Sequence, residues 1–163
     1  MTTLTRTAKA AWDEIVKPEN YVKGDEFEHF VRDRLFLKED YDLLQWTHDY
    51  TTNKNDYAAS KEPDFKLKSI KSGRELFVEV RFYLDFYKGA IEWCKPFQFW
   101  RYKEIDTKTP LYIVIGVGHK PSEPNHLYLL PLKHIRDTTL FRDFLKAYAI
   151  RSTQCIDERS LLN

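Results

Sequence analysis

The sequence predicts an α/β domain with a central mixed β-sheet flanked by helices, and three observations lead to this class. Residues 111–118 are apolar and rich in β-branched side chains, as in a strand buried on both faces. Residues 74–82 carry apolar and aromatic side chains on both faces, interrupted by Glu79 and Arg81, and predict a central strand. Residues 27–35 repeat apolar side chains at helical spacing, which predicts a helix packed on the sheet.

Two helices are predicted before the sheet. Residues 2–18 have apolar side chains at roughly helical spacing, and this helix is expected to end at Pro18 and to pack on the domain or on a partner. Residues 20–36 form an amphipathic helix in which acidic residues lead and arginines follow, as the helix dipole favours. Its apolar stripe consists of Phe27, Phe30, Val31 and Leu35. Glu28 lies at the edge of this stripe, which by itself indicates a boundary residue on a solvated side of the helix.

Three strands follow the second helix. Residues 41–50 contain apolar and aromatic side chains and predict the first strand, whereas the polar residues 51–61 predict a loop. In residues 64–70 apolar side chains alternate with lysines, so this strand has one solvated side. Residues 71–74 have the composition of a hairpin turn and connect it to the central strand at 74–82.

The remaining elements are a helix, two strands and a closing helix. An aromatic loop, residues 83–96, leads into a helix at 97–105 that has Pro96 near its first turn. After the strand at 111–118, residues 126–132 predict another strand, which ends or bulges at its proline. Apolar residues between 140 and 148 mark the closing helix. The predicted order is therefore α-β-β-β-α-β-β-α.

Length and composition indicate one intracellular domain. The 163 residues divide into an N-terminal extension (1–19), a core (20–132) and a C-terminal helix and tail (133–163). The net charge of +1 means that any nucleic-acid surface must be a local patch. Cys94 and Cys155 form no metal-binding or disulfide pattern. No apolar run approaches the roughly 20 residues that span a bilayer, and no signal peptide is evident. We therefore expect a cytoplasmic protein without a membrane partner.

Several enzyme classes have no motif in this sequence. The Gly-rich segment at 116–120 lacks the Gly-Lys-Ser/Thr end of a Walker loop. No Gly-x-Ser-x-Gly elbow occurs, and the five histidines have no zinc-binding spacing.

The functional hypothesis starts from the two charged residues of the central strand. With a side-chain period of two, Glu79 and Arg81 point to the same face near the end of the strand. Unpaired charge in a protein interior costs several kcal/mol, so these side chains need a partner or a function. Asp64 stands at the turn that opens the preceding strand, where the hairpin would bring it near them.

Asp64, a hairpin and Glu79-x-Arg81 together resemble the metal-binding core of the PD-(D/E)XK nuclease superfamily, in which the last motif residue is usually Lys. Two further motifs are similar to motifs of that superfamily. The predicted helix at 20–36 contains Gly24, Phe27, Glu28 and Val31 in a Gly-x-x-Phe-Glu-x-x-Val pattern, in which Gly24 would permit close backbone approach. The helix after the central strand contains Gln98 and Tyr102 in a Gln-x-x-x-Tyr pattern.

The resemblance implies a restriction-endonuclease-like core over residues 20–132 and a metal-dependent nuclease that hydrolyses phosphodiester bonds, with DNA as the favoured substrate. It implies that Asp64 and Glu79 bind Mg²⁺ together with the backbone carbonyl of Val80, and that Glu28 binds a second ion or holds a metal-bound water. Mg²⁺ prefers such hard oxygen ligands, and Mn²⁺ should substitute for it. The implied catalytic residues are Glu28, Asp64, Glu79, Arg81 and Gln98.

Arg81 leaves several outcomes open. An arginine can orient water and stabilise charge, but it cannot act as a base, because its pKa exceeds about 12. The site could work with Arg81, Lys88 or Lys95 could replace the missing lysine, or the chain could be an inactive nuclease-fold protein that binds nucleic acid or a partner protein. The other interpretations are an ion pair of Arg81 with Glu79 or Asp64 without any metal, and an unrelated α/β protein that binds a protein or a small ligand.

Aromatic and basic residues after the central strand predict contacts with nucleic acid. Aromatic rings can stack on bases and cationic side chains can contact phosphates, although packing alone is an equally good interpretation of the aromatics. The residues predicted to bind nucleic acid are Tyr87, Lys88, Lys95, Arg101, Tyr102 and Lys103. Because no added recognition domain is evident, specificity is expected to come from a homodimer or a partner protein.

Overall fold

The computed structural model describes residues 23–47 and 62–161. The predicted helix at 2–18, the end of the first predicted strand and the predicted loop at 51–61 lie outside these residues. Within them the chain is an α/β domain. Its strands are β1 (Tyr41–Trp46), β2 (Phe65–Ser69), β3 (Glu75–Tyr83), β4 (Ala90–Glu92), β5 (Leu111–Val117), β6 (His126–Pro131) and β7 (Thr139–Phe141). Its later helices are α2 (Pro96–Asp106) and α3 (Arg142–Leu145), with short 3₁₀ turns at Leu132–His134, Lys146–Tyr148 and Glu158–Leu161.

A mixed sheet forms the centre of the domain. Within the described part of the chain it has five strands in the order β1-β2-β3-β5-β6. β1, β2 and β3 form an antiparallel meander, β3 and β5 are parallel, and β5 and β6 are antiparallel. The connection between the parallel strands contains α2, since parallel neighbours need a crossover. The α/β class, the mixed sheet and the strands of the meander are therefore confirmed.

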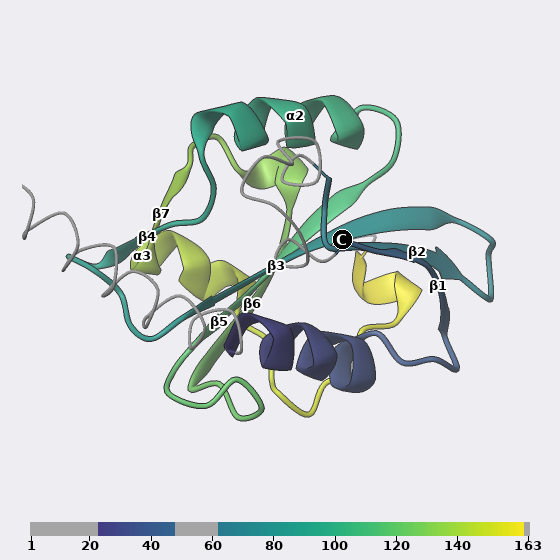
Figure 1. The fold of residues 1–163 in the computed structure, drawn as a ribbon, viewed down its shortest axis with the longest axis horizontal. Helices are drawn as coiled ribbons and strands as arrows, with labels where there is room; N and C mark the ends of the chain where they lie inside the picture. The colour runs from purple at the N-terminus through teal and green to yellow at the C-terminus, as the bar shows by residue number, and fades with distance from the viewer. Residues whose placement is uncertain (1–22, 48–61, 162–163) are drawn as a thin grey trace, which may run out of the picture.

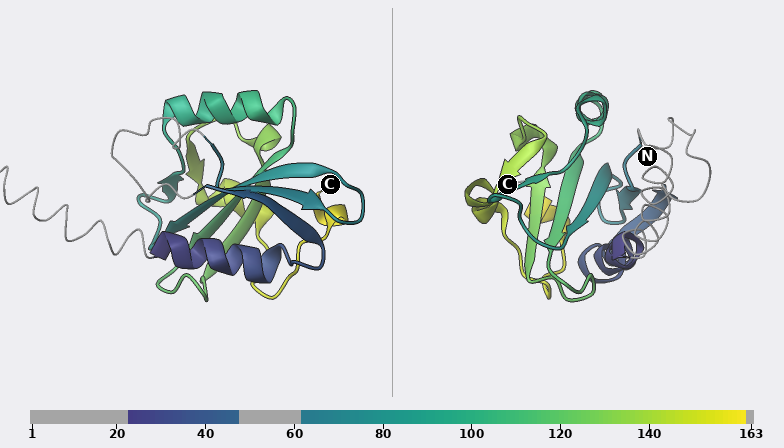
Figure 2. Two further views of the ribbon diagram at one scale, coloured as in Figure 1. Left: turned by 45° about the vertical axis from the view of Figure 1, so that its right-hand side comes forward. Right: turned by 60° about the vertical axis from the view of Figure 1, so that its left-hand side comes forward.

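Helices cover both faces of this sheet, as Figures 1 and 2 show. Residues 23–30 are α-helical and continue as a π-helical turn over Val31–Leu35, and this first helix packs on one face. α2 packs on the other face. In residues 23–47 and 62–161, no helix combines the length and the apolar character needed to span a bilayer.

Successive side chains of β3 point to opposite faces of the sheet, so each one packs toward either the first helix or α2. Val78 and Val80 are buried in the core beneath the first helix. Phe77 and Tyr83 pack on the core beneath α2. Because successive side chains of a strand point to opposite faces, Glu79 and Arg81 face α2.

The structure corrects the predicted C-terminal half. β4 lies in the predicted loop at 83–96 and pairs with β7 in a separate antiparallel ribbon. A closing helix was expected at 140–148, but only Arg142–Leu145 is α-helical, and a 3₁₀ turn continues to Tyr148. Strands of three residues carry too little periodicity to be recognised, and the pairing of Ile91 with Leu140 joins distant parts of the chain.

The C-terminal segment, residues 149–161, is bound to the domain rather than being a loose tail. The Ile156 amide donates to the Leu35 carbonyl at 2.8 Å, at the end of the first helix. The Glu158 carboxylate accepts hydrogen bonds from the hydroxyls of Ser69 and Ser72 in the β2–β3 hairpin. The hydrogen bond from Ser72 is the largest cause that lowers the pKa of Glu158. The segment therefore connects the first helix to the hairpin that carries the candidate site.

Gly116 on β5 allows the first helix to approach the sheet. A Cβ atom at this position would lie 2.5 Å from Cζ of Phe27 and 2.9 Å from Cδ2 of Phe82. We expect Gly116→Ala to lower the free energy of unfolding by about 1–3 kcal/mol, because the buried rings must move to accommodate the methyl group. Urea unfolding followed by circular dichroism measures this change.

Gly24 provides the matched control. No described atom lies within 4 Å of a Cβ built at Gly24, so the described residues make no close approach there. Gly24→Ala should be neutral or should stabilise the helix by up to about 1 kcal/mol, since alanine has the higher helix propensity. A loss of stability as large as that of Gly116→Ala would contradict the role assigned to Gly116.

Candidate active site

The β2–β3 hairpin brings two carboxylates together. Phe65 is paired with Val78 in this antiparallel ladder. Continuing the register by one residue places Asp64 opposite Glu79. Both residues are almost completely buried, with 3% of Asp64 and 1% of Glu79 exposed. The prediction that the hairpin joins Asp64 to the charged end of the central strand is therefore confirmed.

Backbone amides hold the two carboxylates in place. The Val80 amide donates to Oδ2 of Asp64 at 2.7 Å, and the Asp64 amide donates to Oε2 of Glu79 at 3.3 Å. Hydrogen bonds of this kind favour the charged form of an acid. The two carboxylates are thus held in fixed positions at the end of the hairpin.

The guanidinium of Arg81 lies between these groups. Nη2 forms an ion pair with Oε1 of Glu79, and Nη1 lies 4.0 Å from Oδ2 of Asp64. Nη1 also donates to the Val80 carbonyl at 3.2 Å, and Nε donates to the Trp93 carbonyl at 2.9 Å. The Arg81 side chain is 22% exposed, so it forms the open side of the cluster. Glu79 and Arg81 share a face, as the strand period predicts.

Charge and burial shift the pKa values of the groups in and around this cluster. Burial acts to lower the pKa of Arg81, but Glu79 and Asp64 outweigh it, and the net shift is upward. Burial is also the largest cause that raises the pKa of Tyr102, and the Glu79 charge adds to it. Burial raises the pKa of the Cys94 thiol to about 12, which argues against a thiolate nucleophile. Among the described residues, the charged groups in this cluster are therefore two carboxylates and one arginine.

The oxygen atoms predicted to share the first metal ion all face this one cation. Asp64 Oδ2, Glu79 Oε1 and the Val80 carbonyl each contact the guanidinium. Their chemistry suits Mg²⁺ or Mn²⁺, which prefer carboxylate and carbonyl oxygens. The described residues include no group of three or more His, Cys, Asp and Glu side chains suited to a metal ion. Carboxylate and carbonyl oxygens are the kind of ligand that a divalent ion uses, and in this structure they contact the guanidinium of Arg81.

Glu28 is supplied by the first helix and is oriented by β1. It is 8% exposed, so it is more buried than its place at the edge of the helical stripe suggests. Its Oε2 accepts a hydrogen bond from Nε1 of Trp46 at 2.7 Å. This carboxylate is thus positioned from the layer on the other face of the sheet.

Trp46→Phe tests this orientation. The phenyl ring preserves much of the aromatic contact with Phe65, whose ring centroid lies 5.2 Å away, but it cannot donate to Glu28. We expect the free energy of unfolding to fall by about 1.5–3 kcal/mol, the usual contribution of a hydrogen bond to a charged group. Trp100→Phe is the control, since Trp100 is exposed. Chemical denaturation of both variants should show a loss only for Trp46→Phe.

Gln98 caps α2. Its Oε1 accepts the Lys95 amide at 3.0 Å, in the first turn of the helix. This contact gives Gln98 a structural role beside the catalytic role that the resemblance implies.

The residues predicted to bind nucleic acid fall into two groups. Tyr87, Lys88 and Lys95 are exposed, and the ammonium of Lys88 lies 5.4 Å from the centroid of the Tyr87 ring. Lys95 pairs with Glu92 at 3.2 Å. These side chains remain accessible to a phosphate backbone.

The predicted nucleic-acid-binding residues on α2 form contacts within the domain. Arg101 pairs with Glu62 at 2.8 Å, two residues before Asp64. Tyr102 is buried. The ammonium of Lys103 donates to the carbonyls of Leu132 and Ile135. Contrary to the sequence-based expectation of exposed contacts with nucleic acid, Tyr102 is therefore buried beside Glu79, and the ammonium of Lys103 is bound to backbone carbonyls.

Two tryptophans belong to the site although the sequence argument did not select them. Trp93 contributes its carbonyl to Arg81, and Trp46 donates to Glu28. A tryptophan among apolar residues could have indicated a contact, because a buried indole N–H needs an acceptor. A backbone carbonyl gives no such indication.

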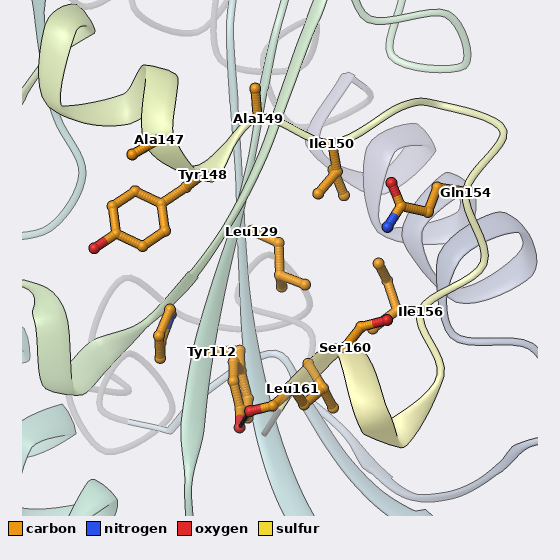
Figure 3. A pocket seen from close by; sticks show the side chains of 11 residues that line it. Tyr112, Leu129, Ala147, Tyr148, Ala149, Ile150, Gln154, Ile156, Ser160 and Leu161 are labelled. Atoms are coloured by element: carbon orange, nitrogen blue, oxygen red, sulfur yellow. Dashed lines mark hydrogen bonds between the residues drawn. The ribbon is translucent and has the colours of Figure 1, made fainter. Parts of the chain in front are cut away.

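A separate hollow of about 250 Å³ lies where the C-terminal segment crosses β5 and β6 (Figure 3). Tyr112 and Leu129 contribute from the sheet, and Ile150, Ile156 and Leu161 contribute from the C-terminal segment. No charged side chain lines it within the described part of the chain. A phosphate would find no cation there, so the carboxylate–arginine cluster is the better candidate for phosphodiester chemistry.

No family model matches this sequence, and no curated protein matches it either.

Proposed function

We propose that this chain is a cytoplasmic, metal-dependent nuclease with a restriction-endonuclease-like core, which hydrolyses phosphodiester bonds in nucleic acid, with DNA as the favoured substrate. One observation carries the proposal: Asp64, Glu79 and the Val80 carbonyl converge on a single cationic group at the end of a hairpin. Buried carboxylates are costly unless their charge is used or compensated.

The architecture supports the same proposal. A first helix, an antiparallel meander, a crossover containing α2 and a parallel strand follow one another along the chain. This order agrees with the nuclease core that the sequence resembles. A likeness of fold does not establish a function, so the weight rests on the residues of the site.

The residues of the site have separable roles in this reaction. Asp64 and Glu79 would hold Mg²⁺ together with the Val80 carbonyl, and the bound ion supplies a charge sink for the phosphate and a water of lowered pKa. The Val80 amide keeps the Asp64 carboxylate oriented. Arg81 neutralises negative charge on the phosphate but cannot remove a proton from water, because its pKa is raised further by the two carboxylates.

A second candidate function is binding without cleavage. The observation that favours it is the position of Arg81, which already compensates both carboxylates and is tied to two backbone carbonyls. A site whose negative charge is reduced in this way could be retained in a protein that binds nucleic acid or a partner protein and does not cut.

The decisive experiment is a cleavage assay on the full chain. Plasmid DNA, single-stranded DNA and RNA are incubated with wild type in Mg²⁺, in Mn²⁺ or with a chelator, and Glu79→Gln is compared with Glu75→Gln. Glu75 lies on the same strand but is exposed and pairs with Lys66. We expect metal-dependent products with wild type and Glu75→Gln and none with Glu79→Gln. Nucleic-acid binding without any product would favour the second candidate, and the absence of both binding and cleavage would reject every function on nucleic acid and leave only the binding of a partner protein.

A further inference from the structure

We infer that Arg81 is an internal counterion that a divalent metal ion must displace, so that the guanidinium and the metal exclude one another between Asp64 and Glu79. The inference rests on the proposed function, because it concerns the metal site of the nuclease. It adds a property of this chain: access of the metal is controlled by one of the site's own side chains.

The geometry leaves no room for both cations. Nη1 of Arg81 lies 3.2 Å from the Val80 carbonyl and 4.0 Å from Oδ2 of Asp64. A magnesium ion must approach its oxygen ligands to about 2.0–2.1 Å. An ion bound to both oxygens would therefore lie against the guanidinium, where contact and like charge both oppose it.

The contacts of Arg81 also indicate how it can leave. Nε is held by the Trp93 carbonyl, which lies outside the carboxylate pair, and the side chain is 22% exposed. Because the guanidinium is a rigid plane, rotation about the aliphatic bonds of the side chain breaks the Trp93 contact together with the carboxylate contacts, and it carries the positive charge toward the exposed side. A phosphate entering from that side would meet a free arginine and a bound metal ion together. Metal and phosphate should therefore strengthen each other's binding, and this linkage is reciprocal.

The affinity for Mn²⁺ tests the displacement without any need for activity. We would measure Mn²⁺ binding to the full chain by electron paramagnetic resonance and by calorimetry, for wild type, Arg81→Lys, Arg81→Gln and the control Arg151→Gln, whose side chain is exposed. Arg81→Gln should bind about tenfold more tightly than wild type or better, since no cation has to be displaced. Arg81→Lys should be intermediate, because its compact ammonium keeps the charge but not the planar fork. Arg151→Gln should equal wild type.

The order of affinities separates displacement from simple repulsion. If charge repulsion alone weakened metal binding, Arg81→Lys would bind as wild type does, and that result would overturn the inference. Equal affinity of wild type and Arg81→Gln would overturn it as well, while leaving a metal-dependent nuclease intact. Failure of every protein to bind Mn²⁺, including folded Arg81→Gln, would instead remove the metal site and with it the proposed function.

A measurement on wild type alone covers the case in which Arg81→Gln does not fold. A short DNA duplex with phosphorothioate linkages is titrated by fluorescence anisotropy with and without Mn²⁺. Affinity for DNA should rise by about tenfold with Mn²⁺, and affinity for Mn²⁺ should rise by the same factor with DNA. Independent binding of the two would contradict a shared, displaceable arginine.

Discussion

Asp64→Asn should reduce both Mn²⁺ affinity and nucleic-acid cleavage by at least about 100-fold, the upper range for losing even an outer-shell partner of a metal site. The amide removes the negative charge that attracts the metal. It also keeps an oxygen that can accept the Val80 amide, which donates to Asp64 at 2.7 Å. The variant should therefore remain folded while the site loses its function. Calorimetry with Mn²⁺ and a plasmid-nicking assay measure the two effects.

Asp42→Asn is the matched control. Asp42 is exposed on β1, so the same substitution there should change neither metal affinity nor cleavage. Equal heats of Mn²⁺ binding for wild type and Asp64→Asn would rule out Asp64 as a ligand. A similar loss in Asp42→Asn would indicate an unspecific effect of charge.

Arg81→Met should lower the free energy of unfolding by about 3–5 kcal/mol in the absence of metal, which is the usual cost of removing one partner from a buried ion pair. Methionine preserves part of the apolar stem but leaves Glu79 and Asp64 without the guanidinium that contacts both. Saturating Mn²⁺ should restore much of the loss, because a ligand that binds only the folded state stabilises it. Urea unfolding with and without Mn²⁺ measures both quantities.

Two further variants test the cause of this loss. Arg74→Met changes an arginine that is 67% exposed, and its effect should stay within about 0.5 kcal/mol. In the double variant Glu79→Gln/Arg81→Met, one of the uncompensated charges is gone, so the loss should be smaller than the sum of the single changes. Additive losses would mean that the ion pair contributes nothing to stability.

Local patterns in the sequence were sufficient for the elements around the site. Burial on both faces identified β3 and β5, and the lysine alternation and turn composition identified the β2–β3 hairpin. The period of a strand alone placed Glu79 and Arg81 on one face, and the ion pair between them agrees with it. These features depend on neighbours along the chain, which is why the sequence could predict them.

Other features depend on contacts between distant segments. The ribbon of β4 and β7 and the C-terminal segment that binds Leu35 and the hairpin have no local pattern of sufficient length. Tyr102 and Lys103 have the composition of a binding surface, yet the packing of α2 turns them inward. Periodicity assigns a residue to a face of its own element but does not say what covers that face.

The amino-acid sequence was sufficient to predict the α/β class, the order of the meander and the candidate carboxylates Asp64 and Glu79. Two features became known only from the packing of the chain: the guanidinium of Arg81 lies among oxygens predicted to bind metal, and Trp46 donates a hydrogen bond to Glu28. The physical reason is that charge compensation acts through space. A strand pattern states that two buried charges need a partner, and only the packing of β2, β3 and α2 shows which group satisfies them.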